Sequence, residues 1–136
     1  VIDSGGAANC GTLGDILVAR LKHRGVAGVV SDGPMRDLAG ILSVGFPILA
    51  TANVAPASMN EVMPIDVDLP IGCGGVAVFP GDVIVADSDG VCVVKRSETG
   101  AVLERAAARE ANEAGKRARL AAGEASLDVF DIRPKA

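Results

Sequence analysis

The stretch LGDILVARLKHRGVAGVVSDGPMRD, Leu13 to Asp37, decides the fold because it joins a helix pattern to a buried strand pattern. Its first half repeats an apolar side chain about every four residues, which predicts an apolar stripe on a helix from Gly14 to Arg24. The stripe would consist of Leu13, Ile16, Leu17 and Leu21. VAGVV, residues 26–30, is a continuous apolar run typical of a strand buried on both faces.

The sequence on either side of this stretch continues the alternation of predicted strands and helices. VIDSGG at residues 1–6 reads as the end of a buried strand, and FPILA at residues 46–50 reads as another. Between them, Pro34 suits the first turn of a second helix ending at Gly45. The residues expected to point inward from this helix are Leu38, Ile41 and Leu42. Strands alternating with helices at this spacing predict βαβ crossovers on a parallel sheet, and therefore an α/β fold.

The second half of the chain has a different pattern. From Pro64 to Lys95, short apolar runs separated by turn residues predict a compact, largely antiparallel β section. Ser97 is then expected to cap a long Ala-rich helix from Glu98 to Ala122. The apolar residues of the tail that follows, which are expected to dock it, are Leu127, Val129, Phe130 and Ile132. We expect a single domain over residues 1–136, of which 97–136 form the carboxyl-terminal helix and tail.

Composition excludes several classes of function. The net charge of −4 and the absence of Trp and Tyr argue against direct nucleic-acid binding. One histidine, His23, in a polar helical context makes a Ser-His-Asp triad or a multi-histidine metal site improbable. The three cysteines lack CxxC spacing and are expected to be free thiols. No apolar run approaches the length of a membrane span, so a cytoplasmic protein is expected, and an opening on Val1 suggests the carboxyl-terminal part of a longer protein.

Asp15 stands at the start of the first predicted helix. An acid there gains about 0.3–1 kcal/mol from the helix dipole, so it needs no function to explain it. The same turn offers free backbone N–H groups from Gly14, Asp15, Ile16 and Leu17, and such groups can hold a carboxylate or a phosphate. In a parallel sheet, this turn and residues 33–37 lie at the same edge, where ligands bind.

Arg36 and Asp37 are harder to explain structurally. A cation in the opening turn of a helix opposes the dipole, and neighbours on a helix point about 100° apart, so the two side chains are not expected to pair with each other. They suit separate roles, with the guanidinium on a substrate oxyanion and the carboxylate on a metal. The residues alone leave the structural and the functional interpretations equally open.

The chain resembles the RraA-like family, which contains divalent-metal-dependent 4-hydroxy-4-methyl-2-oxoglutarate aldolases, oxaloacetate decarboxylases and regulators of ribonuclease activity. The resemblance is carried by VIDSGG, by residues 14–37, by FPILA, by GGVAVFPGDVIVADSDGV and by the helix and tail REANEAGKRARLAAGEASLD. Its most specific motif is an acid, twenty residues, then Arg-Asp, which Asp15, Arg36 and Asp37 fit without a gap.

The resemblance implies a swivelling β/β/α domain assembled as a homotrimer, with sites between subunits. It implies that Asp37 binds Mg²⁺ or Mn²⁺ directly, that Asp15 reaches the metal through water, and that Arg36 and the amides of Gly14 to Leu17 hold the pyruvyl part of a 2-keto acid. A further acid would come from the neighbour's carboxyl-terminal helix, with Glu110 and Glu113 as candidates. The activity implied is cleavage of 4-hydroxy-4-methyl-2-oxoglutarate or 4-carboxy-4-hydroxy-2-oxoadipate to pyruvate, with oxaloacetate decarboxylation. The alternative is a non-catalytic regulator that binds a ribonuclease.

Overall fold

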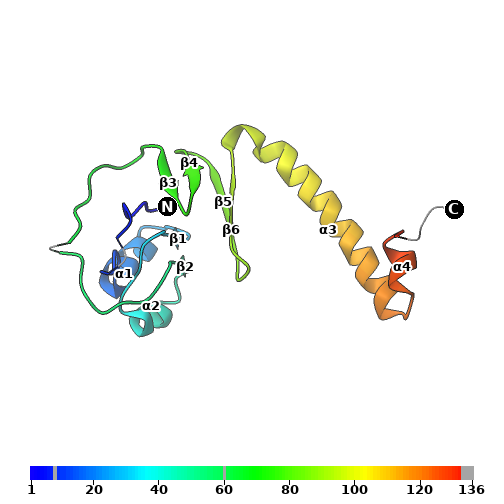
Figure 1. The fold of residues 1–136 in the computed structure, drawn as a ribbon, viewed down its shortest axis with the longest axis horizontal. Coiled ribbons are helices and arrows are strands. Elements are labelled where there is room, and N and C mark those ends of the chain that lie inside the picture. The colour runs from blue at the N-terminus through cyan, green and yellow to red at the C-terminus, as the bar shows by residue number, and fades with distance from the viewer. Residues whose placement is uncertain (8, 60, 133–136) are drawn as a thin grey trace. The chain divides into compact units, whose positions relative to one another are not determined.

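The computed structural model describes residues 1–7, 9–59 and 61–132 (Figure 1). Its contacts divide the chain into two compact units, Val1–Asp82 and Val83–Ala136. Each unit is described by itself. The last four residues of the predicted tail lie outside the described residues.

The first unit is built on parallel pairing, as the sequence predicts. Strand β1 (Val29–Val30) pairs in parallel with β2 (Ile48–Leu49), and Ile2 forms a parallel bridge with Ser31 on the other side of β1. Helix α1 (Asp15–His23) connects Ile2 to β1, and α2 (Leu38–Val44) connects β1 to β2. The α/β class is therefore confirmed, although the regular strands are only two residues long.

Both helices pack on one core. Val18 of α1 and Ile41 of α2 are almost fully buried, and they cluster with Val29 and Phe46. Leu13, Leu21 and Ile48 pack against this cluster from its edge. Helices α1 and α2 also contact each other within this unit.

The predicted apolar stripes were partly wrong. Ile16 and Leu17 are 81% and 55% exposed on α1, and Leu42 is 70% exposed on α2. On α1 the buried position is Val18, one residue beyond Leu17, and one step along a helix rotates a side chain by about 100°. A spacing of four residues drifts from the 3.6-residue turn, and the sequence pattern could not show which side of the stripe faces the sheet.

The start of the second helix also differs from the prediction. Pro34 is buried and lies before the helix. Its carbonyl accepts two hydrogen bonds from Thr12, one from the Thr12 N–H at 2.8 Å and one from the Thr12 hydroxyl at 2.9 Å. Helix α2 begins only at Leu38, with Asp37 as its N-cap residue. Residues 33–36 thus lie outside any helix, and Met35 forms a parallel bridge with Asn53 instead of joining a first helical turn.

The predicted antiparallel β section is confirmed as two hairpins, one in each unit. In the first unit, β3 (Ile71–Cys73) pairs with β4 (Val76–Val78). The Cys73 thiol lies 3.6 Å from the Ile2 carbonyl oxygen, and burial together with the nearby Asp32 carboxylate raises its pKa. Cys10 is likewise buried, Cys92 is exposed, and all three cysteines are free.

Asp32 links the amino-terminal segment to the end of β1. Its Oδ1 accepts a hydrogen bond from the Ser4 N–H at 2.8 Å. Partial burial acts to raise the pKa of this carboxyl, but hydrogen bonds from Ser4 and from the Gly74 N–H outweigh it and leave the pKa below its ordinary value. The charged form therefore stabilises the fold above pH 4, and this contribution is lost as the pH falls through the lowered pKa.

We expect Asp32→Asn to lower the free energy of unfolding at pH 7 by up to about 1 kcal/mol, because a charged acceptor becomes a neutral one. Urea unfolding at pH 7 and at pH 3 would measure it, and the difference between the two proteins should shrink at pH 3. A deficit of the same size at both pH values would show that the charge is not what stabilises this link.

The second unit consists of the other hairpin and the carboxyl-terminal helices. Strand β5 (Val83–Ala86) pairs with β6 (Val91–Val94), a 3-10 turn η1 (Arg96–Glu98) follows, and then α3 (Thr99–Ala121) and α4 (Ser126–Val129). The predicted cap by Ser97 was wrong, because Ser97 lies inside η1 and makes no capping bond, while the Thr99 hydroxyl donates to the Lys95 carbonyl.

The tail docks as predicted, but through one main side chain. Val129 is buried, whereas Leu127, Phe130 and Ile132 are about half exposed or more. Lys116 of α3 lies 5.1 Å from the centre of the Phe130 ring, a cation–π contact. Among the described residues, no helix combines the length and the apolar content that crossing a membrane requires.

Candidate functional site

The edge that the sequence predicts for a ligand is built from three segments joined by backbone hydrogen bonds. The N–H of Arg36 donates to the Leu13 carbonyl at 2.9 Å, which holds the residues before α2 against those before α1. On the other side, the N–H of Met35 donates to the Ala52 carbonyl, and the Met35 carbonyl accepts from the N–H of Val54, both at 2.9 Å. Backbone pairing therefore continues past the ends of the strands and brings the two helix starts together.

Two glycines let these helix starts approach each other closely. A Cβ atom added at Gly14 would lie 2.5 Å from Oδ2 of Asp37 and 3.4 Å from Nε of Arg36. A Cβ atom added at Gly40 of α2 would lie 2.4 Å from Oδ2 of Asp15. Each acid thus occupies the space that a side chain on the opposite helix start would fill, so the structure brings Asp15, Arg36 and Asp37 to one place.

Arg36 and Asp37 form an ion pair, which corrects the expectation that they diverge. Nε of Arg36 lies 2.8 Å from Oδ2 of Asp37, with both side chains about a third exposed. The expectation assumed that both residues are helical, but Arg36 lies before α2 and Asp37 is the N-cap residue of α2. The pair uses one guanidinium nitrogen and one carboxylate oxygen, so both groups keep further atoms for a ligand.

Asp37 has a left-handed backbone conformation, with φ 60° and ψ 40°. Residues other than glycine adopt this conformation uncommonly, and Asp and Asn are enriched among those that do. Such positions concentrate at functional sites, because the surrounding structure must hold them in place. The conformation also directs the carboxylate back toward Gly14 instead of along α2.

The first turn of α1 presents backbone N–H groups at the same edge. Gly14 is the N-cap residue with extended backbone and makes no side-chain capping bond. The N–H groups of Asp15, Ile16 and Leu17 precede the first N–H that donates within the helix, which is that of Val18 to the Gly14 carbonyl. The Ile16 and Leu17 side chains are exposed around them. This turn can accept a carboxylate without any rearrangement of the helix.

The donor set suits a hard divalent cation held mainly by water. Carboxylate oxygens are the ligands that Mg²⁺ and Mn²⁺ prefer, and Mg²⁺ is commonly held by one or two carboxylates with several waters. Within residues 1–7, 9–59 and 61–132, no three His, Cys, Asp or Glu side chains are grouped closely enough to hold a metal alone. Two carboxylates are the donor chemistry of a Mg²⁺ or Mn²⁺ site completed by water, and they are not the ligand set of a closed zinc site.

An open hollow of about 790 Å³ borders Asp37 on its α2 side. The residues lining it are Asp37, Leu38, Ala39, Gly40, Leu42, Asn53, Val54 and Ala55. Asn53 did not emerge from the sequence as a site residue. Its position in the sequence could have indicated it, because residues 51–55 follow the predicted strand at residues 46–50. They therefore lie at the same edge of the sheet as Gly14 and Asp37.

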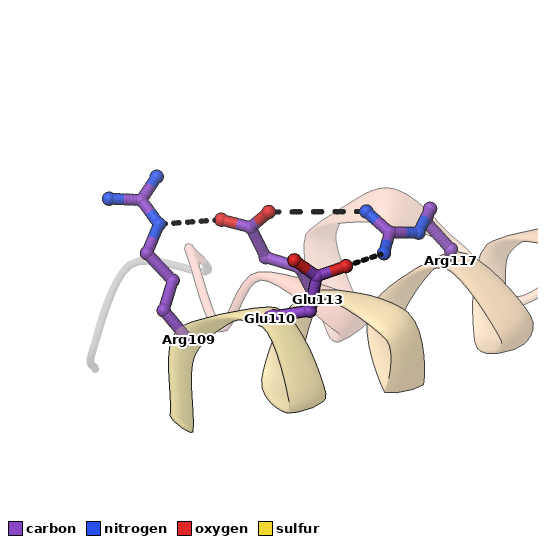
Figure 2. Close-up of polar contacts among 4 residues, drawn as sticks. All are labelled: Arg109, Glu110, Glu113 and Arg117. Carbon is purple, nitrogen blue, oxygen red and sulfur yellow. Dashed lines mark hydrogen bonds and ion pairs between the residues drawn. The ribbon is translucent and has the colours of Figure 1, made fainter. Parts of the chain in front are cut away.

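The acids proposed for a neighbouring subunit lie on α3 in the second unit (Figure 2). Oε1 of Glu113 lies 2.7 Å from Nε of Arg109, and Glu110 lies 3.7 Å from Arg117. The hydrogen bond and the charge of Arg109 hold the pKa of Glu113 below its ordinary value, so Glu113 is an anion at neutral pH. Both acids are thus paired within their own helix, and nothing in one chain distinguishes them as site residues.

Comparison with known proteins gives consistent results. Residues 1–93 match the RraA-like family (Aldolase/RraA). A protein of Halalkalibacterium halodurans named "Putative 4-hydroxy-4-methyl-2-oxoglutarate aldolase" is 37% identical over 113 residues, covering 83% of this chain and 53% of that protein. A protein of Methanocaldococcus jannaschii named as uncharacterized is 33% identical over 88% of this chain and 57% of its own length.

Solved structures show the same fold. Streptomyces coelicolor RraAS2, described as an unusual member of the RNase ES inhibitor RraA protein family, superposes with a TM-score of 0.80 at 38% identity, over 86% of this chain and 60% of that one. An uncharacterized protein from Pseudomonas syringae superposes with a TM-score of 0.90 at 25% identity, over 94% of this chain and 64% of that one. The chain spans just over half the length of the first two curated relatives that it matches.

Proposed function

This chain belongs to the RraA-like family, and we propose that it provides the metal and keto acid site of a divalent-metal-dependent carbon–carbon lyase that releases pyruvate. The observation that carries the proposal is the position of Asp15 and Asp37 opposite Gly40 and Gly14, each on the other helix start, with Arg36 paired to Asp37. The names of relatives such as the H. halodurans protein support the same class of reaction. The substrates to test first are 4-hydroxy-4-methyl-2-oxoglutarate, 4-carboxy-4-hydroxy-2-oxoadipate and oxaloacetate.

In this proposal, Asp37 is a direct ligand of Mg²⁺ or Mn²⁺ and Asp15 holds the metal through water. The bound metal would supply Lewis acid stabilisation of negative charge on the keto oxygen. The N–H groups of Gly14 to Leu17 bind the carboxylate next to the keto group. This arrangement fixes the orientation of the substrate before any bond breaks.

Arg36 stabilises the pyruvate enolate that forms as the bond between C3 and C4 of the substrate breaks. Its ion pair with Asp37 holds the guanidinium in place before the charge develops, so little reorganisation is needed in the transition state. Retro-aldol cleavage requires removal of the C4 hydroxyl proton, whereas decarboxylation does not. Because both reactions leave the same enolate, one site of this kind supports both activities.

The proposal is tested by measuring pyruvate release from the three substrates with Mg²⁺, with Mn²⁺ and after full chelation. We expect release with either metal, loss on chelation and recovery when the metal is restored. Release that survives complete metal removal would refute the metal-dependent mechanism.

A second candidate function is regulation of a ribonuclease by protein binding. It is favoured by the description of the S. coelicolor neighbour as a member of an RNase inhibitor family. Homotrimer formation is compatible with both functions and is measured by sedimentation. Regulation predicts a complex with the ribonuclease that forms equally well with Asp37→Asn and without added metal, whereas the lyase proposal predicts that this variant affects catalysis.

A further inference from the structure

We infer that Asn53 donates a hydrogen bond to the C4 oxygen of a hydroxy keto acid, and that it is needed for retro-aldol cleavage but not for decarboxylation. The inference rests on the proposed function, because it assumes that Asp37 binds a metal that holds the 2-keto group. It adds a residue that distinguishes the two reactions, which otherwise share the same site.

The hollow beside Asp37 offers one side chain that can donate a hydrogen bond. Among the described residues that line it, Asp37 and Asn53 have polar side chains, and the others are Leu, Ala, Val and Gly. The Asp37 carboxylate only accepts hydrogen bonds, whereas the Asn53 amide donates two. Arg36 is paired with Asp37 and belongs to the keto end of the substrate. Asn53 is therefore the lining residue that can donate to a substrate oxygen beyond the metal.

The backbone of Asn53 is fixed relative to the proposed metal ligand. Asn53 forms a parallel bridge with Met35, which is two residues before Asp37. The Met35 N–H donates to the Ala52 carbonyl, and the Met35 carbonyl accepts from the Val54 N–H, both at 2.9 Å. In the part of the chain that the structure describes, the Asn53 side chain is exposed and makes no hydrogen bond. Its amide is thus available to a ligand on a backbone that is already held in place.

The C4 oxygen is the substrate group that gains most from such a donor. As the C4 hydroxyl loses its proton, the C4–O bond becomes a carbonyl, the C3–C4 bond breaks, and its electron pair passes to the enolate. A hydrogen bond to the C4 oxygen stabilises the negative charge that this oxygen carries once its proton has left. Asn53 does not take the proton, because an amide is not a base at neutral pH. The proton passes to water, which the open hollow admits.

Decarboxylation of oxaloacetate gains nothing from the same donor. Oxaloacetate has no C4 hydroxyl, since its C4 is the carboxylate that leaves as carbon dioxide. A hydrogen bond to that carboxylate is strongest before the bond breaks, so it stabilises the substrate and not the transition state. The metal and Arg36 therefore serve both reactions, whereas Asn53 serves retro-aldol cleavage.

The test measures pyruvate release by the full chain from 4-hydroxy-4-methyl-2-oxoglutarate and from oxaloacetate, at saturating Mg²⁺ and after subtraction of the rate with Mg²⁺ alone. We expect Asn53→Ala to lower kcat for the hydroxy acid by about ten- to hundredfold, which is less than a donor in a water-excluded oxyanion hole because this hollow is open. The kcat for oxaloacetate should change by less than about twofold. Asn53→Leu, which keeps a side chain of similar size but removes the donor, should give the same difference between the substrates.

The matched control is Asn112→Leu, at an exposed position of α3, which should leave both rates unchanged. Equal losses with both substrates in Asn53→Ala would assign Asn53 a structural role and overturn the inference, as would full activity of Asn53→Leu on the hydroxy acid. Wild-type cleavage of oxaloacetate alone would overturn it too. In each of these cases, metal-dependent pyruvate release by the wild-type chain upholds the proposed function. If the wild-type chain cleaves neither substrate with Mg²⁺ or Mn²⁺, the proposed function and the inference both fail.

Discussion

Asp37→Asn is expected to lower metal-dependent pyruvate release by about 10²- to 10⁴-fold, because it removes the carboxylate proposed to bind the metal. A bound metal typically stabilises the charge of the transition state by several kcal/mol. The fold should be retained, since Asn tolerates the left-handed backbone that Asp37 adopts. The measurement is the rate of pyruvate release at saturating Mg²⁺, with circular dichroism as the check on folding.

The matched control is Asp68→Asn. Asp68 is also an acid of the first unit in a left-handed conformation, with φ 58°, and it is exposed and remote in sequence from the site. We expect its activity to equal that of the wild-type chain. If the two variants retained the same activity, Asp37 would have no special role and the site would have to be placed elsewhere.

Gly40→Ala is expected to lower the free energy of unfolding by about 1–3 kcal/mol, the typical cost of an extra methyl group in a closely packed contact. Ala is ordinarily favoured over Gly inside a helix by about 1 kcal/mol, so the sign is the opposite of what helix propensity predicts. The reason is the position of Asp15, whose Oδ2, Cβ and Cγ lie 2.4, 2.7 and 2.9 Å from the added Cβ. Displacement of Asp15 should also weaken metal binding.

Gly115→Ala provides the control, because Gly115 lies inside α3 and a Cβ atom there would meet nothing within 4 Å beyond the adjacent residues and the backbone of its own helix. This variant should be more stable than the wild-type chain by about 0.5–1 kcal/mol. Urea unfolding of both variants measures the contrast. Stabilisation by Gly40→Ala would mean that α1 and α2 do not approach each other as closely as described.

The order of elements could be predicted from the sequence, because it depends on the spacing of apolar runs and turn residues. The inward faces of the helices could not. Leu17 and Val18 are adjacent apolar residues, and only the packing against Val29 and Ile41 decides that Val18 is the buried one. The start of α2 was misplaced because Pro34 suits a helix start, while its carbonyl is engaged by Thr12 from a distant segment.

The proximity of the candidate site residues could be predicted, but not their contacts. The spacing of Asp15, Arg36 and Asp37 carries the family resemblance, and the structure brings all three to one edge. The ion pair between Arg36 and Asp37 was missed because it depends on the left-handed backbone of Asp37, which no local pattern reveals. The role of Gly40 was missed for a similar reason, since its lack of a side chain matters only opposite Asp15.

The most direct test of the central claim is titration of the metal-free chain with Mn²⁺, followed by electron paramagnetic resonance of the free ion, in wild type, Asp37→Asn and Asp68→Asn. The account predicts one Mn²⁺ per chain, bound more tightly with pyruvate present, with affinity reduced at least about tenfold in Asp37→Asn and unchanged in Asp68→Asn. Equal Mn²⁺ affinity in wild type and Asp37→Asn would contradict it.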